Sequence, residues 1–284
     1  MTVSLLTVDT ITSTNPFVNP SHLHRYPDRL QTHTKQKQTL TPDHNLFLGT
    51  GSVQAIEALI RAFCTPGKDS ILICPPTYGM YAVSVQVNDV AVLKVPLLSP
   101  PTFALNLAAI LHALSTTPSI KLLYFASPGN LTDSRLSKSN ILHIISHPTW
   151  NGILVLDEAY IDFASHDEST SLVRLVTEVP NLVGIPTIRR NRERVVVQRE
   201  RLMKELLSIW GIGRVRSGTD SNFLIFEILD EFGEPDNAIA GVVYGKLAEV
   251  DGVLVRFRGG EVGCHGCLRV TVGAEGWNDR FWMR

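Results

Sequence analysis

Short apolar runs alternate with longer amphipathic segments between residues 45 and 160. The short runs are typical of buried strands and comprise residues 46–48, 70–74, 90–95, 120–126 and 152–156. The longer segments have apolar residues at helical spacing and comprise residues 53–64, 78–87, 105–114 and 136–145. Nearly continuous apolar strands separated by helices indicate a mostly parallel sheet that is covered on both faces. The pattern therefore predicts the α/β class, with a three-layer α/β/α large domain.

The pattern changes after Pro180. Residues 189–207 form one long charged amphipathic segment, which predicts a helix with a solvated face. Further strands are predicted near 213–216, 222–227, 253–256 and 267–272, with a helix over 238–248. This is a second, smaller α/β unit. We therefore expect an irregular N-terminal arm over 1–44, a large domain over 45–184 and a small domain over 185–284.

Composition argues against a nucleic-acid-binding, membrane or secreted protein. The 284 residues carry 26 basic and 27 acidic side chains, so the charge balance does not favour nucleic acid or an acidic membrane surface. No stretch approaches the roughly 20 apolar residues that span a bilayer. The start of the chain lacks a basic region followed by a continuous apolar run, as a secretory signal would have. We expect a cytoplasmic protein without nucleic-acid or membrane partners.

Four cysteines are present, and two of them form the motif Cys264-His265-Gly266-Cys267. Such a pair can bind zinc or cycle between thiol and disulfide. A structural zinc site normally needs a second pair of ligands, and the chain has no other motif of this kind. We therefore favour unpaired thiols near the start of a strand, and predict no metal site.

Ligands of open parallel sheets bind beyond the carboxyl ends of the strands. After the first predicted strand, Gly51 and Ser52 open a helix whose free N–H groups suit a phosphate. Taken alone, these residues are better explained by an ordinary helix cap by Ser52. After the second strand comes Tyr78, which either stacks on a flat ring or packs in the core.

Three more polar side chains follow later strands. Asn130 follows the strand that ends at Ala126, and Asp157 and Tyr160 follow the run Ile153–Leu156. An aspartate that faces a pyridine nitrogen keeps this nitrogen protonated, and Asn and Tyr can hydrogen-bond a ring hydroxyl. Together with a phosphate cradle and a stacking ring, these residues indicate a pocket for a phosphorylated pyridine.

Seven stretches, in order along most of the chain, resemble the histidinol-phosphate aminotransferases, pyridoxal-phosphate enzymes of fold type I. The motifs RYPD, PPTYGMY, DEAYIDF and CLRVTVG are typical of this branch rather than of aminotransferases at large. The matching stretches are residues 23–31, 46–64, 71–90, 127–134, 147–164, 218–230 and 263–273. The resemblance implies pyridoxal 5'-phosphate as cofactor, a homodimer with shared sites, and a role in histidine biosynthesis. The family reaction moves an amino group from glutamate to imidazole-acetol phosphate, which gives histidinol phosphate and 2-oxoglutarate.

The resemblance also implies a role for individual residues that bind the cofactor. Ser52 and Val53 would lie at its phosphate, and Tyr78 would stack on its ring. Tyr26 would reach the cofactor phosphate of the neighbouring subunit.

The remaining implied roles concern the ring atoms and the substrate. Asn130 and Tyr160 would bond the ring oxygen, and Asp157 would pair with the ring nitrogen. Arg269 would clamp the carboxylate of the amino donor, which suits the planar fork of its guanidinium.

The family's Schiff-base lysine is missing. In the family it follows the DEAY strand in a motif like S-x-S-K-x-F-G-x-A-G, shortly after a stretch like PNLV. Here Pro180–Val183 is followed directly by residues 184–190, which already resemble the small-domain helix. The phosphate-binding arginine expected downstream is absent as well. The sequence therefore predicts an internal deletion, a truncated sheet with an open apolar edge, and no catalytic residue for amino transfer.

None of the eight lysines present is a good substitute. Lys138 lies in Leu136-Ser137-Lys138-Ser139, which superficially mimics the motif but precedes the DEAY strand. Lys204 and Lys246 fall in predicted surface helices. The family's N-P-T-G turn reads Asn130-Leu131-Thr132-Asp133 here, so a proline with a cis bond and a glycine are both replaced.

Three interpretations follow. The chain is an inactive descendant with a real deletion, or the sequence omits coding residues of a normal transaminase. Alternatively, it is a pseudoenzyme that binds the cofactor non-covalently or pairs with an intact homologue. An unrelated α/β protein is disfavoured by the ordered series of matches.

Overall fold

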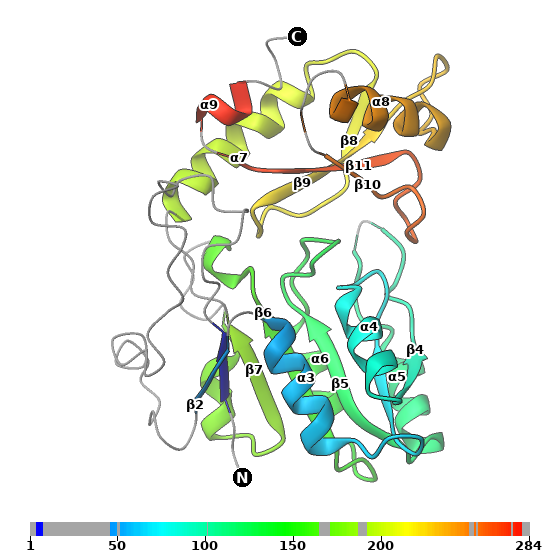
Figure 1. Cartoon of the computed structure of the whole chain (residues 1–284), viewed down its shortest axis with the longest axis vertical. Coiled ribbons are helices and arrows are strands. Elements are labelled where there is room, and N and C mark those ends of the chain that lie inside the picture. The colour runs from blue at the N-terminus through cyan, green and yellow to red at the C-terminus, as the bar shows by residue number, and fades with distance from the viewer. Residues whose placement is uncertain are drawn as a thin grey trace.

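The computed structural model describes residues 4–7, 46–49, 52–100, 102–164, 171–186, 192–249, 253, 255–273 and 275–279. Two larger sheets organise these residues. A five-stranded parallel sheet occupies the lower part of Figure 1, and a four-stranded antiparallel sheet occupies the upper part. Among the described residues, no helix has both the length and the apolar character that a membrane crossing requires.

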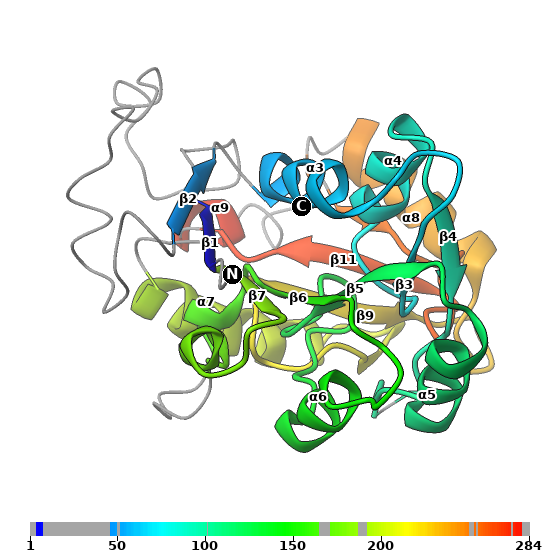
Figure 2. The ribbon, with the colours of Figure 1, turned by 90° about the horizontal axis from the view of Figure 1, so that it is seen from below.

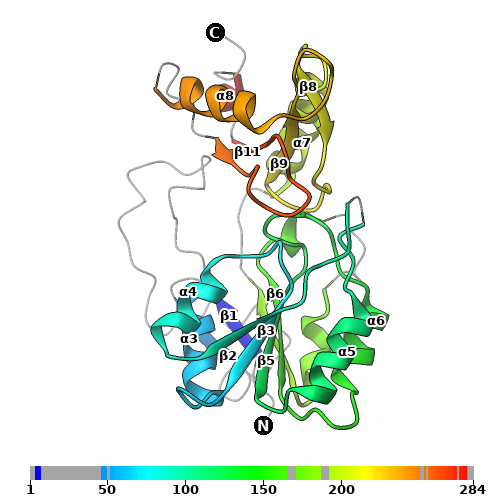
Figure 3. The ribbon, with the colours of Figure 1, turned by 90° about the vertical axis from the view of Figure 1, so that its right-hand side faces the viewer.

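The parallel sheet has the strand order β4-β3-β5-β6-β7. Its strands are β3 (Ser70–Ile73), β4 (Ala91–Lys94), β5 (Ile120–Ala126), β6 (Ile153–Glu158) and β7 (Leu182–Pro186). Its helices are α3 (Ser52–Phe63), α4 (Met80–Val87), α5 (Leu107–Thr116) and α6 (Lys138–Ile145). Helices α3 and α4 cover one face and α5 and α6 the other, as Figure 3 shows. The predicted three-layer α/β/α architecture is thereby confirmed.

Alternation along the strands explains why both faces are covered. In β5, Leu123 and Phe125 pack in the core with α5 and α6, whereas Leu122 and Tyr124 pack with α3 and α4. Successive side chains of a strand point to opposite faces, so a strand that is apolar at every position must be buried on both. The central strand of the sheet is apolar for this reason.

A short strand from the N-terminal part of the chain lies next to β7. Strand β1 (Ser4–Thr7) pairs in parallel with β2 (Leu46–Gly49), and β1 lies beside β7 (Figure 2). The predicted irregular arm therefore contains a strand. β7 is the edge strand of the five-stranded sheet, as predicted, and β1 lies beside it without joining that sheet. A four-residue run is too short to show a periodicity, and its partner lies about 40 residues away, so local sequence reasoning missed it.

β7 also runs through the proposed deletion point. Its residues pair with β6 from Leu182 to Pro186, so the ladder is continuous across Val183 and Gly184. A Cβ on Gly184 would lie 2.5 Å from a methyl group of Val173, in the 3₁₀ helix η3 (Val173–Thr177). The junction residue is therefore a glycine where side-chain space is tight.

The antiparallel sheet has the order β10-β11-β9-β8. Its strands are β8 (Ile212–Val215), β9 (Phe223–Ile228), β10 (Arg256–Phe257) and β11 (Cys267–Thr271). Helices α7 (Arg192–Leu206) and α8 (Asn237–Glu249) contribute Leu206 and Ala240 to one core with Leu224 and Phe226. This is the expected second unit, whereas the domain boundaries at 44 and 184 stay predictions.

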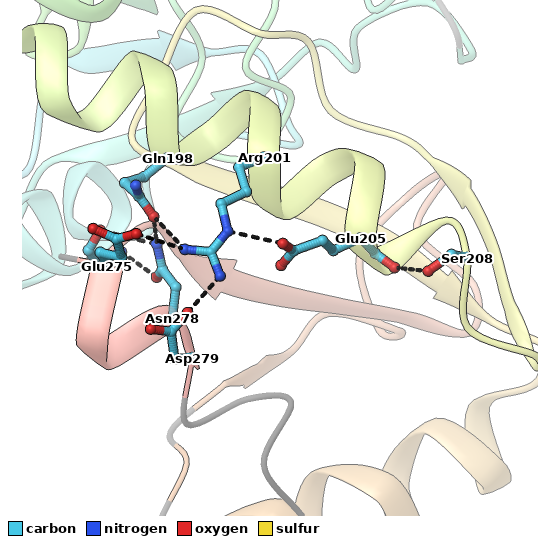
Figure 4. Close-up of polar contacts among 8 residues, drawn as sticks. Gln198, Arg201, Glu205, Ser208, Glu275, Asn278 and Asp279 are labelled. Atoms are coloured by element: carbon cyan, nitrogen blue, oxygen red, sulfur yellow. Dashed lines mark hydrogen bonds and ion pairs between the residues drawn. The ribbon is translucent and has the colours of Figure 1, made fainter.

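A polar network fixes the short helix α9 (Glu275–Asn278) on α7, as Figure 4 shows. Arg201 forms ion pairs with Glu205 at 2.8 Å, with Glu275 at 3.7 Å and with Asp279. The side chain of Asn278 donates to Gln198 at 3.1 Å. These contacts attach the last described residues to the helix that follows β7.

Candidate active site

The carboxyl ends of three neighbouring strands deliver the predicted polar residues to one edge of the parallel sheet. The register pairs Ala126, the last residue of β5, with Asp157 of β6. Asn130 lies in the loop after β5, and Tyr160 directly precedes the 3₁₀ helix η2 (Ile161–Phe163). Parallel strands end at a common edge, so residues that are far apart in sequence meet there.

Asp157 is buried and held by two donors. The Tyr81 hydroxyl donates to Oδ2 at 2.7 Å, and the backbone N–H of Ala159 donates to Oδ1 at 3.0 Å. Burial, followed by the charge of Asp157, raises the pKa of Tyr81 well above its ordinary value. Tyr81 therefore stays a protonated donor that fixes the orientation of the Asp157 carboxylate.

Aromatic contacts connect Asp157 to the start of α3. The ring of Tyr81 stacks on Tyr124 at 4.9 Å, and the Tyr124 hydroxyl donates to the backbone oxygen of Ile56 at 3.1 Å. Ser52 and Val53, the predicted phosphate residues, are the first two residues of this helix. The helix N-terminus is thus tied by packing to the strand that carries the carboxylate.

Tyr78 lies just before α4, in the turn that follows β3. Its ring meets Tyr81 edge-on, with 5.5 Å between centroids. The predicted stacking tyrosine therefore touches the residue that bonds Asp157. The preceding Pro75–Pro76 bond is cis.

Asn130, Tyr160 and Arg269 form a second cluster, which joins the two sheets. The Asn130 side chain donates to the Tyr160 hydroxyl at 2.9 Å. Arg269, on β11, donates from Nη1 to the backbone and side-chain oxygens of Asn130 at 3.2 and 3.3 Å. Its guanidinium carbon lies 4.2 Å from the centre of the Phe223 ring, which Tyr160 meets edge-on.

Arg269 is a buried cation with few polar partners. Its Nε is buried without a hydrogen bond, and none of the ion pairs among the described residues includes Arg269. Burial lowers its pKa, and the neighbouring Tyr160 opposes this. A guanidinium nevertheless stays charged in proteins. A buried charge is costly without an anion, so the cluster suits a ligand carboxylate.

The loop between β5 and α6 is ordered despite its departures from the family motif. The N–H of Asp133 donates to the backbone oxygen of Gly129 at 2.9 Å, and the N–H of Gly129 to that of Ser134 at 3.1 Å. The Ser127–Pro128 bond is cis, whereas the bond before Leu131 is trans. Asp133, where the family has glycine, has a positive φ of 56°. This is the region that glycine adopts most easily.

Two residues of the site were missed by sequence reasoning. Tyr81 belongs to the motif PPTYGMY, for which the sequence predicts a role only at Tyr78. Phe223 lay in a matched stretch without any role, and it forms the surface under Arg269. The signal for Tyr81 was its position three residues after Tyr78 in a helical segment, which places both on one side.

The described lysines lie away from these clusters. Five of them are exposed, and Lys121, near the start of β5, is half-buried and donates to the oxygen of Pro118. The exposed ones are Lys68, Lys94, Lys138, Lys204 and Lys246. Tyr26, Lys35 and Lys37 lie outside the described residues. In the part of the chain that the structure describes, no three His, Cys, Asp or Glu residues gather as metal ligands would.

Comparison with known proteins decides the family. The family described as aminotransferase class I and II matches residues 10–187. The histidinol-phosphate aminotransferase of Schizosaccharomyces pombe is 38% identical over 325 aligned positions, which cover 91% of this chain and 83% of the relative. The chain belongs to the histidinol-phosphate aminotransferase family.

Solved structures agree with this family at the level of the fold. The histidinol-phosphate aminotransferase of Clostridium acetobutylicum superimposes with a TM-score of 0.72 at 18% identity, covering 96% of each chain. That of Sinorhizobium meliloti, solved in complex with pyridoxal-5'-phosphate, gives 0.66 at 16% identity, covering 82% of this chain and 73% of its own. Both matches support the α/β architecture of the family.

Proposed function

We propose that this chain is a histidinol-phosphate aminotransferase by descent that binds pyridoxal phosphate and a substrate carboxylate reversibly but does not complete amino transfer. The observation that carries the proposal is the meeting of Asn130, Tyr160 and Arg269, which the resemblance assigns to the ring oxygen and the substrate carboxylate. A maintained binding site without its covalent anchor fits these facts best.

The residues at the strand ends are chemically suited to the cofactor. Asp157 presents a carboxylate, which is the group that would accept from a protonated ring nitrogen, and Tyr81 fixes the orientation of this carboxylate. Ser52 and Val53 would hold the phosphate at the start of α3, and Tyr78 would cover the ring. When bound, pyridoxal phosphate supplies an electron sink for the substrate carbon.

The substrate end of the site relies on Arg269. Its unpartnered Nε and its buried charge would be satisfied by a carboxylate such as that of glutamate or 2-oxoglutarate. Phe223 holds the guanidinium plane from below, which limits its rotation. Asn130 contacts both Arg269 and Tyr160 and so sets the spacing between the two ligand groups.

The proposed inactivity rests on the missing lysine. Amino transfer needs an amine that holds the cofactor and moves a proton at the substrate carbon. The alignment with the S. pombe relative has 325 positions, which is more than the 284 residues of this chain. At some aligned positions the relative therefore has a residue where this chain has a gap. Such gaps are what an internal omission near Val183 produces. Five of the six lysines in the described part of the chain are exposed, and none of these six follows the DEAY strand in a serine–lysine motif.

Titration with pyridoxal phosphate tests the proposal. We expect reversible binding, lost on dialysis, and weakened roughly tenfold or more by Asp157→Asn. The control Asp230→Asn, in the turn between β9 and α8, should bind like the parent chain. After borohydride treatment, peptide mapping should show only scattered surface labelling. Stoichiometric labelling of one lysine would contradict the inactivity, and the absence of any saturable binding would contradict the binding site.

Sequencing of the transcript across the codons for Val183 and Gly184 separates a real deletion from an incomplete sequence. A message that joins these codons directly supports the proposal. A message with an inserted serine–lysine motif would make the natural protein a normal transaminase.

Association is a further part of the proposal. We expect a cytoplasmic protein. We also expect a homodimer, because the resemblance gives Tyr26 a role in the neighbouring subunit's site. Light scattering should give about twice the monomer mass of 31.4 kDa. The alternative, a binding subunit for an intact homologue, would instead give a mixed complex on copurification.

A further inference from the structure

The motif Cys264-His265-Gly266-Cys267 forms a tight turn directly before β11. The N–H of Cys267 donates to the backbone oxygen of Cys264 at 3.0 Å, and Gly266 has a φ of 66°. Such a turn brings its first and fourth Cα atoms within about 7 Å, which overlaps the spacing found in disulfides. A Cβ on Gly266 would lie 2.6 Å from the backbone nitrogen of Asp236, so the turn depends on this glycine.

The two thiols interact and are unequal. A hydrogen bond from Cys267 lowers the pKa of Cys264, with Arg216 and Arg258 adding to the effect against burial and Glu261. The same hydrogen bond and burial raise the pKa of Cys267. Cys264 is therefore the more readily ionised thiol and the better nucleophile of the pair.

The pair lies next to the cluster at Arg269. Cys267 and Arg269 are two residues apart on β11, so their side chains share one face of the sheet. Both thiols pack with Leu131 and Phe223, which adjoin Asn130 and Arg269 respectively. A change in the turn is therefore transmitted through direct packing contacts to the residues proposed to bind the substrate.

The two thiols differ in burial. Cys264 retains 3% of its surface, whereas Cys267 is fully buried. The glycine-rich loop 258–263 directly precedes Cys264 and exposes Val262, and an ion pair of 3.9 Å between Arg258 and Glu261 spans this loop. Cys264 is therefore the less buried thiol as well as the more readily ionised one, and we expect it to react first.

We propose that Cys264 and Cys267 are a redox-active dithiol that forms a disulfide by exchange with a low-molecular-weight disulfide, and that oxidation alters the neighbouring loop 127–134. The other two cysteines differ: Cys64 and Cys74 are buried separately in the parallel-sheet unit, and burial raises their pKa values to about 11 and about 12. This exchange requires neither bound cofactor nor catalysis by the chain.

The exchange is balanced in atoms and electrons. The Cys264 thiolate attacks one sulfur of oxidised glutathione, which forms a mixed disulfide and releases one glutathione thiolate. The Cys267 thiol loses its proton and attacks the Cys264 sulfur, which releases the second glutathione. Two electrons pass from the cysteine sulfurs to glutathione disulfide, and the two protons end on the released thiols.

Equilibration of the full chain in glutathione redox buffers tests the chemistry. We expect loss of two of the four thiols and a peptide with Cys264 linked to Cys267. Cys264→Ser and Cys267→Ser should each abolish this product, and the control Cys64→Ser should retain it. The disulfide can also be mapped by peptide analysis of the parent chain, so the test does not require that the variants fold. Persistence of all four thiols, or a stable mixed disulfide without closure, would overturn the proposal.

Hydrogen exchange tests the coupling. Peptides from residues 127–134 should exchange at a different rate in the oxidised and reduced chain, while peptides from α8 should not. Cys267→Ser should remove this redox dependence. Identical exchange in both states would overturn the coupling and leave only the dithiol chemistry.

Discussion

At the residue scale, Tyr81 determines how the central carboxylate is presented. Its hydroxyl bonds Asp157 from within the core, and its ring lies between Tyr78 and Tyr124. The carboxylate is buried, so its orientation cannot be set by solvent. A fixed carboxylate at a strand tip is what a site for a protonated ring nitrogen requires.

We expect Tyr81→Phe to destabilise the chain by about 1–3 kcal/mol, because it removes a hydrogen bond from a hydroxyl to a buried carboxylate. The ring packing is retained, so the loss reports the hydrogen bond. Urea denaturation measures the change in the free energy of unfolding. Tyr244→Phe, on α8, is the matched control and should cost less. Equal effects of the two variants would refute the role given to Tyr81.

At the scale of elements, the loop 127–134 is fitted against the turn that precedes β9. The N–H of Gly218 donates to the backbone oxygen of Thr132 at 3.1 Å. A Cβ on Gly218 would lie 2.4 Å from the backbone oxygen of Asp133. The close approach of two backbones therefore requires glycine here and holds Asn130 near β11.

We expect Gly218→Ala to lower the free energy of unfolding by about 1–3 kcal/mol, because the two backbones must separate. Gly241→Ala, within α8, meets no atom within 4 Å and should instead stabilise the helix by about 0.5–1 kcal/mol. Thermal and urea unfolding of both variants check this contrast in sign. A neutral Gly218→Ala would show that the loop does not depend on this contact.

At the scale of the whole molecule, Asp133 lies where the two units meet. Its Oδ1 accepts from the N–H of Asp220 at 3.1 Å, while its Oδ2 is buried without a hydrogen bond. Burial raises the pKa of Asp133 to about 8, against opposing contributions from Ser221 and Arg199. The neighbouring acid, Asp220, forms an ion pair with Arg135 at 2.9 Å, so its negative charge is neutralised.

The pH dependence of stability follows from this shift. Below the ordinary pKa of an aspartate, near 4, both states bind the proton and the group has no effect. Between about 4 and about 8 the folded state holds the proton more tightly than the unfolded state, so stability falls as pH rises.

We expect Asp133→Asn to stabilise the chain above pH 4, with a gain that grows up to about pH 8 and then levels off. Asparagine tolerates the positive φ and keeps one acceptor oxygen. Asp89→Asn is the matched control, since Asp89 also has a positive φ of 53° but is exposed. Urea denaturation from pH 4 to 9 measures both. A gain that is independent of pH would contradict the shifted pKa.

Sequence reasoning located most elements of the fold within a few residues. The helix expected over 53–64 spans Ser52–Phe63, and the strand expected over 120–126 has the same bounds. These elements have a long periodic pattern, which local interactions determine. The strand β1 was missed, because it depends on a partner distant in sequence. The predicted edge at β7 carries no further hydrogen-bonded strand in its sheet, although β1 lies beside it.

The candidate site likewise contains residues that the sequence predicted and residues that only the structure revealed. Asp157, Asn130 and Tyr160 were identified from their places after apolar runs. Tyr81 and Phe223 were not, because nothing in a helical or strand pattern says which buried aromatic side chain touches a polar group. The burial of Asp133 also had no signature in the local sequence.

The sequence by itself determined the fold class, the order of the elements, the family and the missing lysine motif, because periodicity and motif spacing are local properties of the chain. The tertiary structure alone decided that Arg269 reaches Asn130, 139 residues away, that β1 lies beside β7, and that two thiols lie next to the cluster of Asn130, Tyr160 and Arg269. These contacts arise from the packing of segments that are far apart in the sequence, and such packing selects partners by shape and burial rather than by neighbourhood in sequence.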